Sequence, residues 1–287
     1  PPLMATMSAS GPPSAFGRRA SRAGLVIVGL LYVAVLLLAP LAGIVWSTLR
    51  DGVGVVTETL GQHDVRHAFW LTAVITAITV VVTTVLGVVV SWVLTRDRFI
   101  GRRLVDAVVD LPLAVSPVIV GLTAILLFGR GGWFEPFLTA QGIQILFALP
   151  SMILVTIFIC IPFVVREVAP VLEELGTEEE EAALTLGASS LQTFFKVTLP
   201  GIKWGLLYGI ALTTARAMGE IGAVLIVSGS IQGQTETATL FIFRALEERQ
   251  DTQALVVALA LAGISILILV AIELAKRRQP SRRSEIS

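Results

Sequence analysis

Two stretches of this sequence, residues 23–49 and 68–95, each contain more than 25 residues without a charged side chain. The hydrocarbon core of a bilayer is about 30 Å thick, and a helix crosses it with about 20 residues. Unpaired backbone groups are costly in lipid, so spanning segments of this kind are helical. We therefore expect an all-helical membrane protein. The first stretch is too long and too apolar to be a cleaved signal peptide.

Four further apolar stretches bring the predicted membrane spans to six. They cover residues 111–129, 142–165, 204–229 and 254–272. Only 15% of the residues are charged, against about 25% in soluble domains. We predict one membrane domain over residues 23–278, with disordered cytoplasmic tails at residues 1–22 and 279–287.

Basic residues are concentrated in alternate loops. Three arginines precede the first span, four separate the second and third spans, and five lysines and arginines follow the sixth span. The other loops contain two, one and two arginines. The positive-inside rule then places both termini, and the segment over residues 166–203, in the cytoplasm.

That cytoplasmic segment contains the polar stretch TEEEEAALTLGASSLQTFFKVTLP, residues 177–200. Thr177 with Glu180 fits a capping box at a helix start, and Ser189 with Gln192 fits a second one. Gly187 between them predicts a break between two short helices, and we expect Pro200 to close the segment.

One face of these two short helices is apolar. Its residues recur at helical spacing: Leu184, Ala188, Leu191 and Phe195. Helices that lie on lipid usually carry basic residues on their polar side, whereas this segment begins with four glutamates. The pattern favours docking into a groove on a soluble partner, and a helix resting on the bilayer surface is the alternative.

The spacing of several residues in this segment resembles the EAA loop of ABC importer permeases. They are Glu181, Ala182, Ala183, Gly187, Leu199 and Pro200. Val197 differs from the isoleucine that is frequent in that family. In the family the loop is a coupling helix that sits in a cleft of a cytoplasmic ATPase. The resemblance implies that role for these six residues, within a coupling loop over residues 170–200.

Three other stretches resemble permeases for sulfate and related tetrahedral oxyanions: residues 111–129, 156–174 and 215–237. The third is more similar to the W-type than to the T-type permease subunit. The resemblance implies a type I (MetI-like) permease fold with six transmembrane helices, in a bacterial plasma membrane. It also implies as partners a T-type subunit, two copies of an ATPase and an extracytoplasmic sulfate-binding protein. Ile221 and Phe241 stand where the family usually has Phe and Pro, so thiosulfate, molybdate, tungstate and phosphate remain alternative substrates.

Two ionisable residues interrupt the fifth predicted span. Arg216 and Glu220 are four residues apart, hence on one face of a helix. Charges inside a membrane face protein or water, so we interpret them as an ion pair that holds or gates the bundle. The alternative is that Arg216 attracts the anion to the translocation pathway.

The third predicted span contains a possible helix break at Ser116, Pro117 and Gly121. Proline removes a helical hydrogen bond and glycine permits close approach. We favour an ordinary kink or close helix packing, since Pro and Gly are common in transmembrane helices. The alternative is that freed amides and the Ser116 hydroxyl donate to an oxyanion. Asp106 and Asp110, just before this span, are expected to pair with arginines at the cytoplasmic interface.

Several chemistries have no support in the sequence. No GxxxxGK[ST] phosphate-binding motif is found, so ATP and Mg are expected on the partner ATPase and no cofactor on this chain. His63 and His67, the only histidines, are expected in an external loop, and Cys160 in the core, so we predict neither a catalytic nor a metal site. The net charge of +0 gives no reason to expect nucleic acid. A secondary transporter, which often has inverted repeats, is the alternative class, but no repeat is visible.

Overall fold

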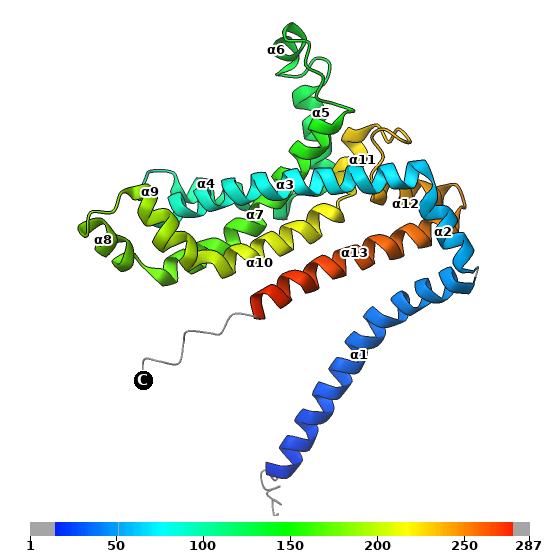
Figure 1. Ribbon diagram of the computed structural model, residues 1–287, viewed down its shortest axis with the longest axis horizontal. Helices are drawn as coiled ribbons and strands as arrows, with labels where there is room; N and C mark the ends of the chain where they lie inside the picture. The colour runs from blue at the N-terminus through cyan, green and yellow to red at the C-terminus, as the bar shows by residue number, and fades with distance from the viewer. Residues whose placement is uncertain (1–14, 51, 278–287) are drawn as a thin grey trace, which may run out of the picture. The chain divides into compact units, whose positions relative to one another are not determined.

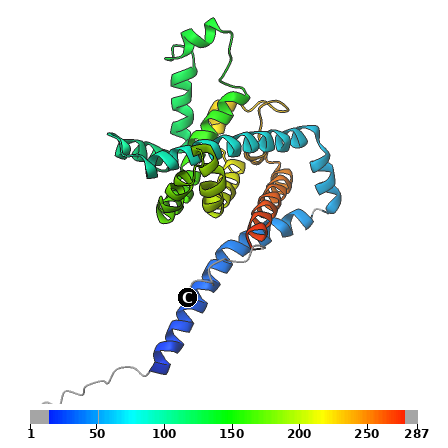
Figure 2. The ribbon, with the colours of Figure 1, turned by 60° about the vertical axis from the view of Figure 1, so that its left-hand side comes forward.

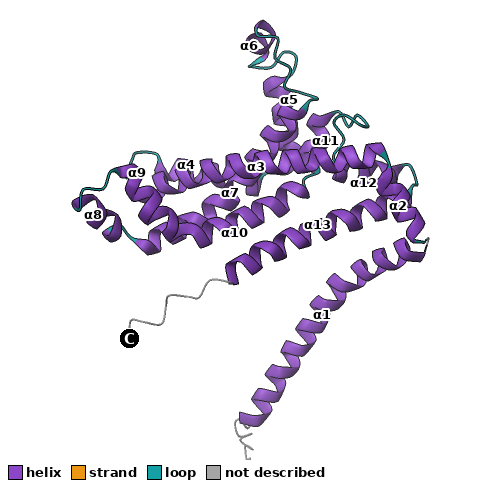
Figure 3. Ribbon diagram, viewed as in Figure 1, coloured by secondary structure: helices purple, strands orange, loops and turns teal. Residues whose placement is uncertain are grey.

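The computed structural model describes residues 15–50 and 52–277, and every regular element in those ranges is a helix (Figure 3). The chain divides after Gly52 into two compact units. The first unit contains α1 (Ala15–Arg50). The second contains α2 (Val53–Gly61), α3 (His63–Arg96), α4 (Arg102–Ala114), α5 (Pro117–Phe128), α6 (Glu135–Ala140), α7 (Leu149–Leu175), α8 (Glu178–Thr185), α9 (Ser190–Thr193), the π-helical turn η1 (Phe194–Thr198), α10 (Leu199–Met218), α11 (Gly222–Ser228), α12 (Ala238–Glu247) and α13 (Asp251–Arg277).

The helix α1 contains the first predicted span. Its segment Val26–Thr48 is long and apolar enough to cross a membrane. The N-terminal tail predicted over residues 1–22 is helical from Ala15 onward. Residues 1–14, and the C-terminal tail predicted over residues 279–287, lie outside the described residues.

The second unit is a bundle in which α3, α7 and α10 pack on one another and α13 packs on α10 and α12 (Figure 1). Glycines allow the closest crossings. A Cβ atom on Gly87 of α3 would lie 2.6 Å from Cβ of Val164 in α7, and one on Gly205 of α10 would lie 2.6 Å from the carbonyl oxygen of Glu167. Small residues let transmembrane backbones approach in this way.

The third predicted span is a broken helix. α4 and α5 meet at an angle of 113°, and α5 turns away from the bundle and leads into α6 (Figures 1 and 2). Pro117 is the first residue of α5, and the residue before a proline is disfavoured in a helix. α10 and α11 form a second bent pair, with an angle of 53°. Counting each bent pair as one span, the described chain has the six predicted spans, and four of them are single helices.

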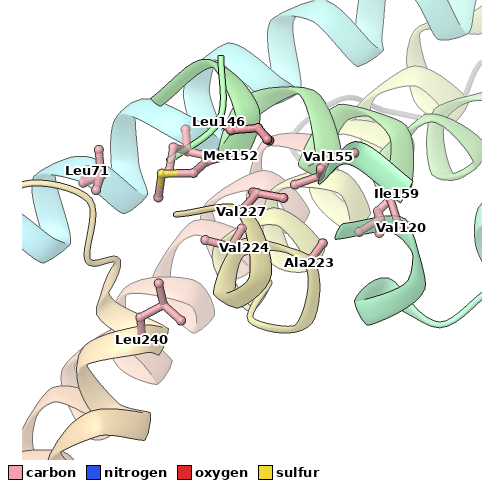
Figure 4. Close-up of a cluster of buried hydrophobic side chains, with 12 residues drawn as sticks. Leu71, Val120, Leu146, Met152, Val155, Ile159, Ala223, Val224, Val227 and Leu240 are labelled. Carbon is pink, nitrogen blue, oxygen red and sulfur yellow. The ribbon is translucent and has the colours of Figure 1, made fainter. Parts of the chain in front are cut away.

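The two broken helices meet in the main apolar core. Twelve buried side chains pack there, from α3, α5, α7, α11, α12 and the loop before α7 (Figure 4). Met152 and Val155 of α7 lie among Val120 of α5 and Val224 and Val227 of α11. The core therefore fixes the position of both helix breaks.

Two sequence predictions about helix ends are wrong. The fourth span starts at Leu149 instead of residue 142, because Pro150 in the first turn begins the helix. The preceding loop is held by a hydrogen bond from the Phe147 amide to the Val227 carbonyl, at 2.9 Å. His63 and His67 lie in the first two turns of α3 instead of in a loop.

Candidate functional site

The polar segment between α7 and α10 lies at one end of the bundle, beyond the ends of α3 and α7 (Figure 1). The turn between α8 and α9 is at Gly187, whose φ of +89° belongs to the left-handed region that favours glycine. Ser189 and Gln192 form the predicted capping box, with N–O distances of 3.3 and 3.0 Å. Pro200 lies in the first turn of α10, where proline is tolerated. The helix continues through it, so the prediction that Pro200 closes the segment is wrong.

Glu180 anchors this segment to the bundle through Arg96, the last residue of α3. The Glu180 carboxylate accepts hydrogen bonds from Arg96 Nε at 3.1 Å and Nη2 at 3.2 Å, and from the Thr198 hydroxyl at 2.9 Å. Arg96 also donates to the carbonyls of Leu172 and Gly176 at 3.0 and 2.6 Å. The Arg96 and Glu180 side chains are only 11% and 13% exposed.

The predicted capping box of Thr177 with Glu180 is therefore wrong. Glu180 faces the bundle, where a buried guanidinium binds a carboxylate more strongly than one backbone amide does. The Thr177 hydroxyl donates instead to Glu181, at 2.7 Å on the surface.

The segment exposes four large apolar side chains, and of these Phe195 contacts the neighbouring Phe194 ring, with ring centroids 5.1 Å apart. We call this group the apolar surface; its residues are Leu184, Leu186, Leu191 and Phe195, with exposures of 49, 89, 72 and 60%. Leu186 lies in the turn, outside the helical periodicity, so sequence spacing did not include it. Beside Phe195, the Phe194 ring contacts Trp92 of α3, with ring centroids 5.6 Å apart.

The six residues implied by the EAA resemblance divide into two groups. Glu181, Ala182 and Gly187 are exposed on the segment, as is Pro200, and Ala183 is half-buried. Leu199 packs against the bundle core. The exposed residues are accessible to a partner, and Leu199 holds the start of α10 in place.

Arg216 and Glu220 form the predicted ion pair, with Nη1 and Oε2 2.6 Å apart. The reason differs from the prediction, because α10 ends at Met218 and Glu220 lies in the break before α11. Its other carboxylate oxygen accepts a hydrogen bond from the Ala223 amide in the first turn of α11, at 2.9 Å. Glu220 therefore neutralises Arg216 and caps α11 at once.

The structure brings the two helix breaks together. A Cβ atom on Gly222 at the start of α11 would lie 3.0 Å from Cβ of Pro117 at the start of α5, and one on Gly121 would lie 2.8 Å from Cβ of Ile226. Ser116 is exposed, and its hydroxyl does not cap α5. The candidate residues of the third and fifth spans thus belong to neighbouring half-helices. Their role in a pathway stays a prediction.

Asp106 and Asp110 of α4 pair with an arginine, as expected, and the partner is Arg166 of α7. Arg166 Nη2 lies 2.9 Å from Asp106 Oδ1, and Arg166 Nε lies 2.7 Å from Asp110 Oδ1. This cluster holds α4 against α7 at the same end of the bundle as α8.

A second charged cluster at the opposite end was missed by sequence reasoning. Arg244 of α12 donates to the buried Glu236 carboxylate at 2.7 and 3.1 Å and to Glu248 at 2.9 Å. The hydrogen bond from Glu236 raises the pKa of the Arg244 guanidinium above its ordinary value. The contact secures the loop over residues 229–237 to α12. No sequence pattern pointed to it, because Glu236 precedes α12 and helical spacing does not relate it to Arg244.

The helical bundle and its membrane-length apolar helices define a multi-pass membrane protein. A family model described as the binding-protein-dependent transport system inner membrane component matches residues 83–284. The chain belongs to this family, the permease components of ABC transporters.

Curated relatives agree over most of the chain. It is 46% identical to the sulfate transport system permease protein CysW of Synechococcus elongatus, over 86% of each protein. It is 38% identical to the sulfate transport system permease protein CysT of Salmonella typhimurium, over 87% of this chain and 90% of that one.

Solved structures agree in fold. Two crystal structures of a bacterial ABC transporter that imports the polysaccharide alginate, one of them with a substrate-bound periplasmic protein, match with TM-scores of 0.77 and 0.78. Each match covers 91% of this chain and 96% of the other, at 16% identity. The six-span type I permease fold predicted from the sequence is confirmed.

Proposed function

We propose that this chain is the W-type permease subunit of an ATP-driven sulfate importer in a bacterial inner membrane. The identity to CysW proteins supports the substrate class. The observation that carries the coupling role is the exposed apolar surface of α8 and α9, fixed to the bundle by Arg96 and Glu180. An amphipathic helix with such a face is the form that docks into a hydrophobic groove of a partner.

The partners follow from the same family. A T-type permease subunit would complete the channel, since the chain also resembles CysT proteins. Two copies of a cytoplasmic ATPase would bind the coupling segments, and an extracytoplasmic sulfate-binding protein would deliver the anion. ATP and Mg would be bound by the ATPase, so that this chain itself carries neither cofactor nor hydrolytic activity.

The charge pair suits transport better than tight capture. Conduction needs binding weak enough for release. Arg216 attracts a dianion, but Glu220 lies 2.6 Å away and offsets most of that attraction. The neighbouring start of α5, with the exposed Ser116 hydroxyl, offers neutral donors. High affinity would then reside in the external binding protein.

Radiolabelled sulfate uptake tests the proposal, in cells that lack this chain and in the same cells with the chain restored. We expect restoration of uptake, competition by unlabelled thiosulfate, and no competition by molybdate. Uptake should also disappear when the partner ATPase is deleted, whereas a secondary transporter would continue to work. Absence of sulfate uptake with the protein inserted and its partners present would refute sulfate as the substrate. Competition by molybdate would favour a permease for molybdate or tungstate.

A further inference from the structure

A polar cavity lies between the last turn of α3, the first turns of α4 and the second half of α7. Its volume is about 340 Å³. Three guanidinium groups, two carboxylates and a hydroxyl line its wall: Arg102, Arg103, Arg166, Asp106, Glu173 and Thr95. It is separate from the apolar surface and from the Arg216–Glu220 pair.

The ion pairs in and beside the cavity leave one arginine without a direct carboxylate partner. Arg166 is bound by Asp106 at 2.9 Å and by Asp110, and Arg102 lies 3.8 Å from Glu173, at the limit of an ion pair. Among the described residues, Arg103 has neither a hydrogen bond nor an ion pair and is exposed. The wall therefore presents Arg103, and a weakly held Arg102, to an anion. Guanidinium groups suit phosphate because they donate two parallel hydrogen bonds.

Exposed apolar side chains lie outside the cavity lining, on the neighbouring face of α4 and in the turn before it. Leu104 and Val108 lie one turn apart on α4, and Ile100 lies in the turn before it; all three are exposed. A free anion would bind the arginines but gain nothing from the apolar side chains. A phospholipid would contact both, because its acyl chains cover the apolar side chains while its headgroup reaches the arginines.

We propose that this cavity binds the headgroup phosphate of an anionic phospholipid from the cytoplasmic leaflet. The basic loop between the second and third spans faces that leaflet by the positive-inside rule, and this leaflet attracts basic residues next to the membrane. The bound lipid would join α4 to α7 beside the Arg166 cluster. The inference concerns lipid binding alone and does not depend on which anion is transported.

Native mass spectrometry of the full chain, purified with its associated subunits, tests this inference. The complex is taken from nanodiscs that contain phosphatidylglycerol and phosphatidylcholine, and the retained lipids are counted. We expect preferential retention of phosphatidylglycerol by the natural chain. The double variant R102Q/R103Q should retain it about 25-fold less strongly, at about five-fold for each arginine. The matched control is R130Q, an exposed arginine after α5, which should retain the lipid normally.

A second variant separates the cavity from general surface charge. A169F fills the cavity from α7 without changing any charge, and it should also lose the lipid. Normal retention by A169F, or by the double variant, would overturn the inference. Equal retention of the two lipids by the natural chain would do the same without any substitution. Displacement of phosphatidylglycerol by millimolar inorganic phosphate or sulfate would show a site for free anions instead.

Discussion

The anchoring of the coupling segment by Glu180 gives the sharpest prediction, because a matched glutamate stands next to it. Glu180→Ala removes three hydrogen bonds, two from Arg96 and one from Thr198, and leaves a guanidinium that is only 11% exposed. Breaking a buried ion pair by removing one partner costs about 3–5 kcal/mol. Arg96 keeps two carbonyl partners, so we expect a loss near the lower end, about 3 kcal/mol.

That loss should act locally, on the attachment of residues 177–198 to the bundle. Since about 1.4 kcal/mol corresponds to a factor of ten, opening of the segment should become about 100-fold more frequent. Hydrogen exchange of the α8 amides in nanodiscs measures such opening. Glu180→Gln keeps an acceptor but loses the charge, and charged hydrogen bonds are about twice as strong as neutral ones. An intermediate effect is therefore expected.

Glu181→Ala is the control. Its carboxylate is on the surface and accepts only the Thr177 hydroxyl, so its loss should change exchange by about 0.5 kcal/mol or less. ATPase binding should weaken in Glu180→Ala because the segment is loosened. It should also weaken in Glu181→Ala and Glu181→Arg because the exposed surface is changed. Equal hydrogen exchange in Glu180→Ala and Glu181→Ala would refute the anchoring argument.

Three further predictions concern the pathway, the turn and the packing. Arg216→Ala and Glu220→Ala should each lower sulfate uptake. Each should also reduce the free energy of unfolding by about 3–5 kcal/mol, which a lower melting temperature would report. Glu220→Gln keeps the oxygen that accepts from the Ala223 amide and should melt at a higher temperature than Glu220→Ala. Unchanged uptake and assembly in all three would show that the pair is dispensable. Gly187→Ala should cost about 1–2 kcal/mol at its φ of +89° and weaken ATPase binding in a titration. Gly187→Asn should be milder, and equal binding by both and by the natural chain would contradict the turn's role. Gly205→Leu should destabilise the fold by about 1–3 kcal/mol through overpacking against α7 and so lower the melting temperature. Gly263, with open space around it, is the control, and Gly263→Leu should melt like the natural chain. Similar melting temperatures of the two variants would count against close packing at Gly205.

Local patterns predicted local structure well. The box of Ser189 and Gln192 needs only residues three apart, and it formed as expected. The membrane spans could be predicted from the length of the apolar stretches, because the thickness of the bilayer sets that length whatever the fold. The position of Pro117 likewise marked the break in the third span.

Contacts between distant residues could not be predicted in the same way. Glu180 binds an arginine 84 residues away in the sequence, and no local pattern relates the two. The sequence showed only the nearby Thr177, and this led to the wrong prediction of a capping box. The angle of 113° at Ser116 depends on where α5 docks on α11, which involves Gly121 and Ile226. The exposure of Leu186 depends on the turn geometry at Gly187, and helical periodicity does not describe a turn.

The helix α10, Leu199–Met218, has a mechanical consequence. At about 1.5 Å per residue its 20 residues are about 30 Å long, with Thr198, which binds Glu180, just before one end and Arg216 near the other. If ATPase binding displaced the start of α10, the continuous helix would carry that displacement to Arg216. The break after Met218, where α10 and α11 meet at 53°, would then convert it into a change of the angle between the two helices.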